Sequence, residues 1–172
     1  MRNKMIMLIS VLLFLMTLVG CNNIDENENR EVSPTFSLPV TFGDGTKGEY
    51  LLIGEEGKVG LLVGSGKTGE VVEEKFIANK ANKHMWYFWG EKDSISGDFK
   101  VVGIDKAGKE HPVLLSGNDK VWQFSNASIS PNGGADSHIP SNMVFPTSGL
   151  WKLEIYFNDK LFGEIVINVE ES

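Results

Sequence analysis

The sequence predicts an all-β fold, either a sandwich or a barrel, on three observations. From Thr35 onward, turn-forming residues interrupt the chain at short intervals, short runs rich in branched and aromatic residues lie between them, and no long stretch has a helical period. The turn signals lie at 43–45, 56–57, 64–69 and 158–159. The predicted strands are Val59–Val63, Val71–Ile77, His84–Trp89, Phe99–Ile104, Val113–Leu115, Trp151–Phe157 and Leu161–Val169.

The last two of these runs predict a β-hairpin. The residues of one face are apolar, whereas Lys152 and Glu154 point to the other face, which is the pattern of a half-buried strand. The apolar residues are Trp151, Leu153, Ile155 and Phe157. Asn158-Asp159 then supplies a two-residue turn into the final strand.

Two segments do not fit a simple succession of strands. Residues 78–83 are predicted to form a helical turn or a loop. Residues 126–149 are rich in proline, glycine, serine and asparagine and are predicted to form a loop, with a short strand at Met143–Phe145. A loop of 24 residues is uncommon in a compact domain. The segment is therefore either functional or contains an element that the pattern hides.

The N-terminus has the pattern of an export signal. Arg2 and Lys4 precede an apolar run, Met5–Gly20, in which only Ser10 and Thr17 are polar. Sixteen residues are few for a membrane-spanning helix, which needs about 20. We therefore expect residues 1–20 to be a cleaved signal peptide.

The end of this run, Leu18-Val19-Gly20-Cys21, resembles the lipobox of bacterial lipoproteins. The resemblance implies cleavage between Gly20 and Cys21 and a diacylglyceryl lipid on Cys21. Two acyl chains give stable anchoring, so the protein is expected on the extracytoplasmic face of the cell membrane. Cys21 is the only cysteine, and a disulfide within the chain is therefore impossible.

The composition predicts the extent of the tether and of the domain, and the net charge. Residues 21–34 are charged and poor in apolar side chains, which predicts a disordered acidic tether, and residues 35–172 suffice for a single domain. The net charge of the chain is −7, and it falls to about −9 once Arg2 and Lys4 are lost. Nucleic acid is an unlikely partner for such a surface, because binding to phosphates depends on clustered lysine and arginine.

Two runs resemble binding motifs. Gly64–Thr68 ends like a phosphate-binding loop, but Leu61 occupies the position of the first glycine and no helix follows, so we interpret it as a hairpin turn. His84–Trp89 alternates large apolar residues on both faces, which favours a buried central strand. The alternative is a partly exposed platform for sugar rings, with Trp86 and Trp89 as its binding residues.

Asp136 and His138 lie two positions apart in the most turn-rich part of the domain. Together with His84 or His111 they are weak candidates for a carboxylate–imidazole metal site, or the pair could orient a general base. The simpler interpretation is that Asp136 holds a turn and His138 bonds to the backbone. No catalytic triad or pair of acid residues is recognisable, and the sequence calls for no cofactor.

A family resemblance rests on residues 134–141 and 145–153, together with 84–90 and 161–163. In these segments the chain resembles small lipoproteins of Bacillus-type Gram-positive bacteria that carry an immunoglobulin-like domain of unknown function. The resemblance covers most of residues 36–169. It implies an immunoglobulin-like β-sandwich on the surface of a cell with one membrane, and it assigns no catalytic residue.

These observations favour a non-enzymatic binding or accessory module for a protein or a component of the cell envelope. Asp136 and His138 are the predicted contact residues, because recognition surfaces commonly lie on loops. A metal-binding protein or metal-dependent hydrolase that uses Asp136, His138 and His84 is one alternative. A module that binds cell-wall carbohydrate through Trp86, Trp89 or Trp151 is another.

Overall fold

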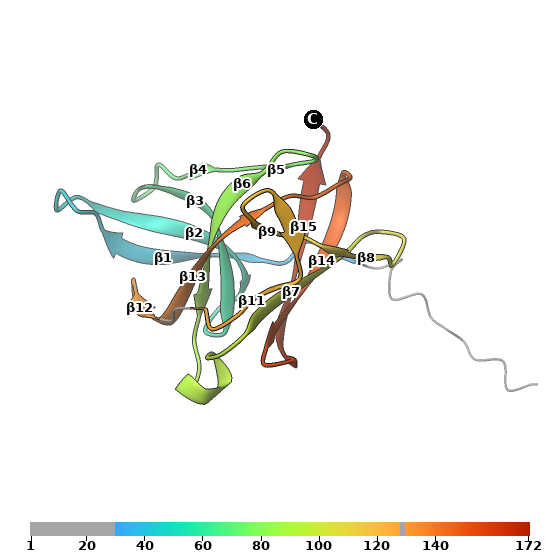
Figure 1. Cartoon of the computed structure of the whole chain (residues 1–172). Helices are drawn as coiled ribbons and strands as arrows, with labels where there is room; N and C mark the ends of the chain where they lie inside the picture. The colour runs from blue at the N-terminus through green and yellow to red at the C-terminus, as the bar shows by residue number, and fades with distance from the viewer. Residues whose placement is uncertain (1–29, 128–129) are drawn as a thin grey trace, which may run out of the picture.

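The computed structural model describes residues 30–127 and 130–172, whose strands form two sheets packed as a sandwich (Figure 1). The predicted all-β, immunoglobulin-like sandwich is thus confirmed. The predicted signal peptide, Cys21 and residues 21–29 of the predicted tether lie outside the described residues. Within the described part of the chain, no helix has the length and apolar character needed to cross a membrane.

The larger sheet, sheet A, contains nine of the described strands. Its main path is β1 (Thr35–Thr41), β2 (Lys47–Glu55), β3 (Val59–Lys67), β6 (Asn82–Phe88), β13 (Ala135–Met143), β9 (Leu114–Ser116) and β10 (Asp119–Val121). Two short strands lie beside this path: β4 (Val72–Glu73) pairs with β3, and β12 (Ser130–Asn132) pairs with β13.

The smaller sheet, sheet B, contains six of the described strands. Its path is β11 (Gln123–Phe124), β7 (Phe99–Ile104), β14 (Gly149–Phe157), β15 (Lys160–Glu170) and β5 (Phe76–Ile77), and β8 (Glu110–Pro112) pairs with β7. A short 3-10 helix, η2 (Lys92–Ser94), precedes β7. Among the described pairs of strands only β5 and β15 run parallel.

The main core fills the space between the two sheets. Trp86 from sheet A and Trp151 from sheet B are both fully buried in it. The indole nitrogen of Trp86 donates to Ser141 Oγ at 2.9 Å, and that of Trp151 donates to the Thr147 carbonyl at 3.0 Å, so neither buried donor lacks a partner. Among the described residues, those of the apolar clusters lie between Phe36 and Val169.

The C-terminal hairpin is confirmed. Strands β14 and β15 pair antiparallel, and Phe157 lies opposite Lys160 across the two-residue turn. Asn158 and Asp159 have φ angles of 49° and 62°, as a turn that matches the twist of a hairpin requires. The four apolar residues of the predicted inner face of β14 are buried, because they pack against sheet A.

The predicted long loop at 126–149 is wrong. It contains β12 and the nine-residue β13, which lies in the middle of sheet A between β6 and β9. Buried and exposed residues alternate along β13, but two of its buried positions are Ser137 and Ser141, and Pro140 occupies an exposed one. The strand therefore lacks the apolar alternation that sequence reasoning looks for.

The predicted strand Val71–Ile77 is two strands that belong to different sheets. β4 pairs with β3 in sheet A, so the predicted hairpin is present, but Gly64–Lys67 belong to β3 and the turn lies after Lys67. β5 pairs with β15 in sheet B. We call residues 72–77 the strap, because they cross between the sheets at one end of the sandwich (Figure 1). Residues 78–81 then form a turn that leads into β6.

Residues 30–34, which are predicted to belong to the tether, are bonded to the domain. Arg30 donates to the carbonyls of Ile104 and Asp105 at 3.0 and 2.8 Å. The Ser33 amide donates to the Val166 carbonyl, and its hydroxyl accepts from the Val166 amide at 2.8 Å. These bonds fix residues 30–34 against sheet B, so the ordered domain begins before β1.

Candidate functional site

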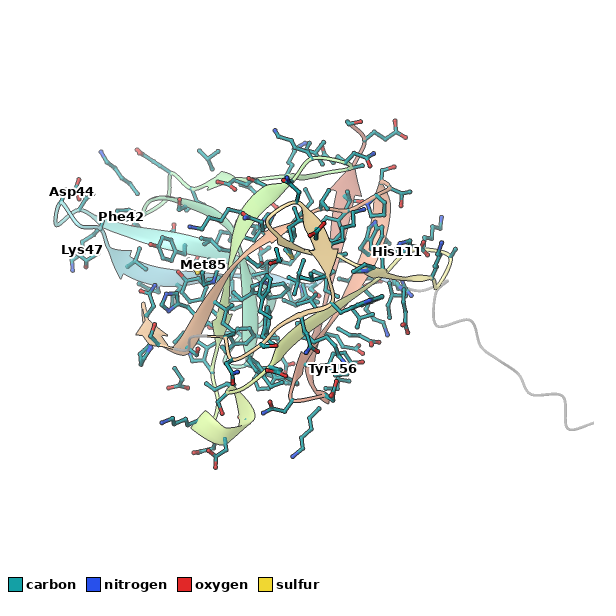
Figure 2. All side chains as sticks on the ribbon, viewed as in Figure 1. Phe42, Asp44, Lys47, Met85, His111 and Tyr156 are labelled. Carbon is teal, nitrogen blue, oxygen red and sulfur yellow. The ribbon has the colours of Figure 1, made fainter. Side chains whose placement is uncertain are left out.

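The outer face of sheet A carries a second apolar cluster. Along β6, His84, Trp86 and Phe88 point to the inside of the sandwich, so the alternate residues point outward. Nine residues form this cluster, which we call the outer cluster: Leu52, Tyr87 and Ala135 are buried, and Phe36, Leu38, Tyr50, Leu62, Met85 and Trp89 are partly buried. Met85 and the adjacent Phe42 lie on the β1–β2 side of the molecule, away from Tyr156 of sheet B (Figure 2).

Aromatic contacts connect the strands of this face. Phe36 and Trp89 have ring centroids 6.0 Å apart, as do Tyr50 and Tyr87, and the His138 ring stacks on Tyr87 at 6.4 Å. Such pairs contribute about 0.5–1.5 kcal/mol each beyond the burial of their area. The contacts therefore hold a row of rings in place across sheet A, in which Tyr87 is buried and the other rings remain partly exposed.

Asp136 and His138 lie on the same outer face and bond to the backbone. Asp136 Oδ2 accepts from the Gly90 amide at 2.9 Å, and His138 Nδ1 is 2.7 Å from the Ser130 carbonyl, to which it donates. Trp89 belongs to the same network, because its indole nitrogen donates to the Gly134 carbonyl at 3.0 Å. The simpler of the interpretations of Asp136 and His138 therefore fits the geometry.

Replacing Asp136 with alanine is expected to destabilise the domain by about 1 kcal/mol, because the Gly90 amide loses its acceptor at an exposed position that water can reach. Denaturant unfolding measures this difference. Asp136→Asn keeps an acceptor oxygen and is expected to recover most of the loss. Equal stability of all three proteins would contradict a positioning role for the carboxylate.

His84 does not join Asp136 and His138, which corrects the predicted metal set. Its side chain lies on the inner face of β6 and is only 6% exposed, with its ring stacked on Phe76 at 4.8 Å between centroids. The two histidines thus lie on opposite faces of sheet A. Within the described residues, no group of three or more histidine, cysteine, aspartate or glutamate side chains is arranged to hold a metal ion.

Two of the tryptophans proposed for sugar binding are buried. Trp86 and Trp151 are both fully buried in the main core, so neither can contact a ligand, and the prediction of Trp86 as a binding residue is wrong. The interpretation of residues 84–89 as a buried central strand is correct for the inner face only. Trp89, which is partly buried in the outer cluster, is the remaining candidate of this group.

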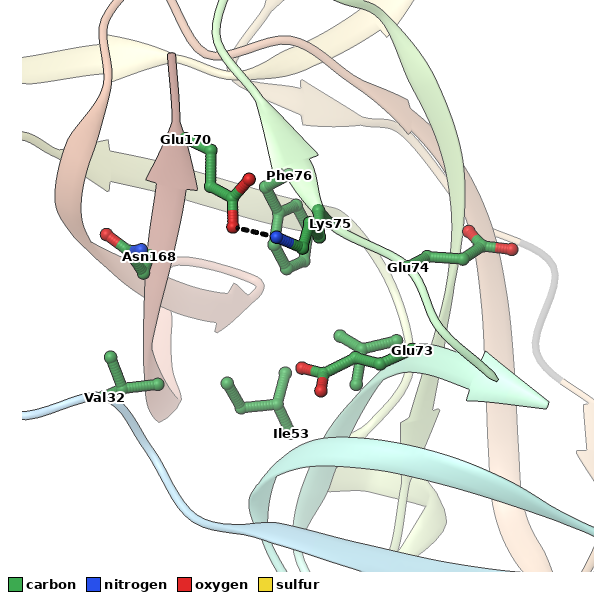
Figure 3. A pocket seen from close by; sticks show the side chains of 9 residues that line it. Val32, Ile53, Glu73, Glu74, Lys75, Phe76, Asn168 and Glu170 are labelled. Atoms are coloured by element: carbon green, nitrogen blue, oxygen red, sulfur yellow. Dashed lines mark ion pairs between the residues drawn. The ribbon is translucent and has the colours of Figure 1, made fainter. Parts of the chain in front are cut away.

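A cavity of about 230 Å³ opens at the strap and was not predicted from the sequence. Ile53, Val63 and Phe76 are its buried apolar lining, which we call the floor. Glu73 and the ion pair between Lys75 and Glu170 are part of its charged lining (Figure 3). The distance from Lys75 Nζ to Glu170 Oε1 is 2.7 Å, and this pairing raises the pKa of Lys75 above its usual value. The charged residues 73–75 before Phe76 are the sequence signal for this cavity, but the pattern of residues 71–77 predicts one continuous strand.

A smaller cavity of about 160 Å³ lies on the other side of Glu74. It forms where sheet A splits, because β3 pairs with β6 only as far as Leu61 and then pairs with β4. His84 lines this cavity, and its imidazole hydrogen-bonds to the Leu62 backbone. Burial lowers the pKa of His84 from 6.5 to about 4, and the bond to Leu62 only partly opposes that effect.

Comparisons with known proteins agree with this fold. Residues 26–167 match the model of a family described as a domain of unknown function, DUF4871. A crystal structure of a candidate lipoprotein from Bacillus anthracis superposes with a TM-score of 0.59 and 25% sequence identity, over 83% of this chain and 87% of that one. No curated protein matches the sequence. The predicted resemblance to lipoproteins of Bacillus-type bacteria is confirmed by these matches.

Proposed function

The chain belongs to the DUF4871 family, and from that premise we propose that it is a non-enzymatic docking module that binds a protein of the cell envelope through the outer cluster. In this proposal, lipid on Cys21 holds the domain at the extracytoplasmic face of the cell membrane. The single observation that carries the proposal is the outer cluster of sheet A, in which six of the nine apolar residues are only partly buried.

The two outer faces of the sandwich differ in chemistry. The outer face of sheet B carries ion pairs in which Lys152 contacts Glu154 at 2.7 Å and Glu164 at 3.5 Å, as is usual for a solvated sheet. The outer face of sheet A carries the nine apolar residues of the outer cluster, with Asp136 and His138 beside them. Interfaces between proteins are enriched in tyrosine, tryptophan, phenylalanine and methionine and depleted of lysine and glutamate at their centres. This contrast supports sheet A as the docking side.

Hydrogen bonding on this face favours a protein over a carbohydrate. A site for a polar ligand needs a few correctly placed polar groups that remain available to it. Here the Trp89 indole nitrogen, the Asp136 carboxylate and His138 Nδ1 each bond to the backbone. An apolar partner surface requires none of these groups, so it can cover the outer cluster without breaking the bonds that shape it.

Two observations support the membrane anchor. The lipobox-like run ends at Cys21, and the similar structure from Bacillus anthracis is described as a candidate lipoprotein. Residues 22–29 lie between the cysteine and Arg30, and the chain from Cys21 to Arg30 spans at most about 30 Å when fully extended. The outer cluster is therefore expected to meet partners that lie close to the membrane surface.

Site-specific photo-crosslinking in intact cells tests the proposal. Tyr50 in the outer cluster and Tyr156 on the outer face of sheet B are both partly buried tyrosines, so they form a matched pair for replacement by a photoreactive phenylalanine. Crosslinks to an envelope protein are expected from position 50 and not from position 156. Cys21→Ser is expected to release the protein from the membrane and to abolish the crosslink.

A charge placed in the docking face provides the control. Met85→Lys is expected to abolish the crosslink from position 50, because the introduced ammonium group would have to be desolvated at the interface. Thermal unfolding of this variant checks that the fold is kept, since Met85 is only partly buried. Crosslinking of the same proteins from both tyrosine positions, or an unaltered crosslink in Met85→Lys, would refute the docking side.

A further inference from the structure

The strap cavity combines an apolar floor with a predominantly anionic rim. Ile53, Val63 and Phe76 are each less than 10% exposed, and they line about 230 Å³ of space that opens to solvent. The Glu73 side chain points into this space from the strap, and Val32 lies across from it (Figure 3). The cavity is smaller than the ~300–1,000 Å³ of sites for drug-sized molecules, so its ligand is a small molecule.

The rim already holds an alkylammonium group of the protein itself. Lys75 reaches Glu170 at 2.7 Å, and Glu73 acts on the same ammonium by charge attraction. With Glu74, three carboxylates thus line the cavity beside one ammonium, which leaves an excess of negative charge. A butyl chain that ends in an ammonium is therefore accommodated beside these carboxylates, and the pair is exposed enough to be exchanged for another cation.

A second, independent observation comes from the cavity on the other side of Glu74. His84 lines it and is 6% exposed, and its Nδ1 is buried without a hydrogen-bond partner. A neutral imidazole has one nitrogen that can accept a hydrogen bond, and the carboxylate of Glu74, which lines both cavities, can only accept. A ligand that donates hydrogen bonds therefore suits the polar groups around the strap.

We propose that the strap cavity binds a small organic cation, a protonated amine on an apolar body. The apolar part would cover Ile53, Val63 and Phe76, and the ammonium would lie between Glu73 and Glu170 in the place that Lys75 now occupies. This site goes beyond the docking function, because the strap closes one end of the sandwich whereas the outer cluster lies on the outer face of sheet A. The docking function and the cation site can therefore be refuted independently.

Titration with three ligands of equal length tests the site. The chain from Asn22 onward contains all residues of the described core and is titrated with hexylamine, hexanoate and hexanol, with the methyl NMR signals of Ile53 and Val63 as the readout. Hexylamine alone is expected to shift them. The methyl signals of Leu161, at the other end of β15, are expected to stay unchanged. No shift with hexylamine, or equal shifts with all three compounds, overturns the proposal.

Charge variants assign the effect to the rim. Glu73→Gln is expected to weaken hexylamine binding about two- to fivefold, as loss of one exposed ion pair implies, whereas Glu91→Gln, remote from the strap, is expected to leave it unchanged. Lys75→Met removes the competing ammonium and is expected to strengthen binding by a similar factor. Weaker binding in Lys75→Met, or equal effects of the two glutamine variants, would contradict a cation site.

Discussion

Acidification is expected to destabilise the sandwich by about 3 kcal/mol through His84 alone. The pKa of this imidazole is about 4 in the folded protein, compared with 6.5 when it is exposed. Between these values the unfolded chain binds more protons than the folded one, so protonation favours unfolding. Stability from this group is fully present above pH 6.5, falls as the pH drops, and is lost below about pH 4.

Urea unfolding at a series of pH values measures this dependence, with His84→Phe as the matched control. Phenylalanine keeps a ring against Phe76 but does not titrate. Carboxylates with lowered pKa values, such as Glu154 and Asp105, add a loss at low pH in both proteins, so the difference between the two curves isolates His84. Parallel curves between pH 4 and 6.5 would show that the imidazole is not buried as described.

Replacing Trp86 with alanine is expected to cost about 3–5 kcal/mol of unfolding free energy, enough to unfold a marginally stable domain. Trp86 is fully buried, packs edge-on against Phe99 at 5.7 Å, and donates to Ser141. The substitution removes all three interactions and leaves a cavity between the sheets. Denaturant unfolding followed by circular dichroism measures the loss.

Trp122 provides the comparison for this prediction. Its side chain is 41% exposed, between β10 and β11, and Trp122→Ala is expected to change stability by no more than about 1 kcal/mol. Ser141→Ala separates the hydrogen bond from the packing, since it leaves the buried indole donor unpaired at a cost of about 1–3 kcal/mol. Similar losses from both tryptophan variants would contradict the assignment of Trp86 to the core.

The parts of the fold that sequence reasoning predicts correctly are those in which burial and alternation coincide. The β14–β15 hairpin has apolar residues at every inward position of β14 and a two-residue turn, so its pattern can be recognised locally. β13 is as long as β14 and also lies inside its sheet, but serine fills inward positions 137 and 141. Ser141 is buried because it accepts from Trp86, a partner that is 55 residues away in the chain.

The candidate sites depend on strand register, which the sequence does not specify. Asp136 and His138 could be paired from their spacing, but His84 lies on the opposite face of sheet A, and only the pairing of β6 with β13 fixes that relation. The outer cluster draws its residues from five strands and the residue after β6, so no local window contains it. The sequence pattern does not reveal the strap, because residues 71–77 resemble one continuous strand. In the structure the chain passes from sheet A to sheet B at Glu74 and Lys75, between β4 and β5.

The attachment of residues 30–34 to sheet B determines how the domain responds to mechanical force. A pull on the chain ahead of Arg30 is transmitted first to the bonds of Arg30 with Ile104 and Asp105, and then to the two bonds between Ser33 and Val166. Val166 lies in β15, which is held along its length by β14, so the load enters through a strand in the interior of sheet B. Edge strand β1 contributes Phe36 and Leu38 to the outer cluster. It bears force only after the bonds that hold residues 30–34 have broken. The docking face would therefore keep its shape while the domain is under tension.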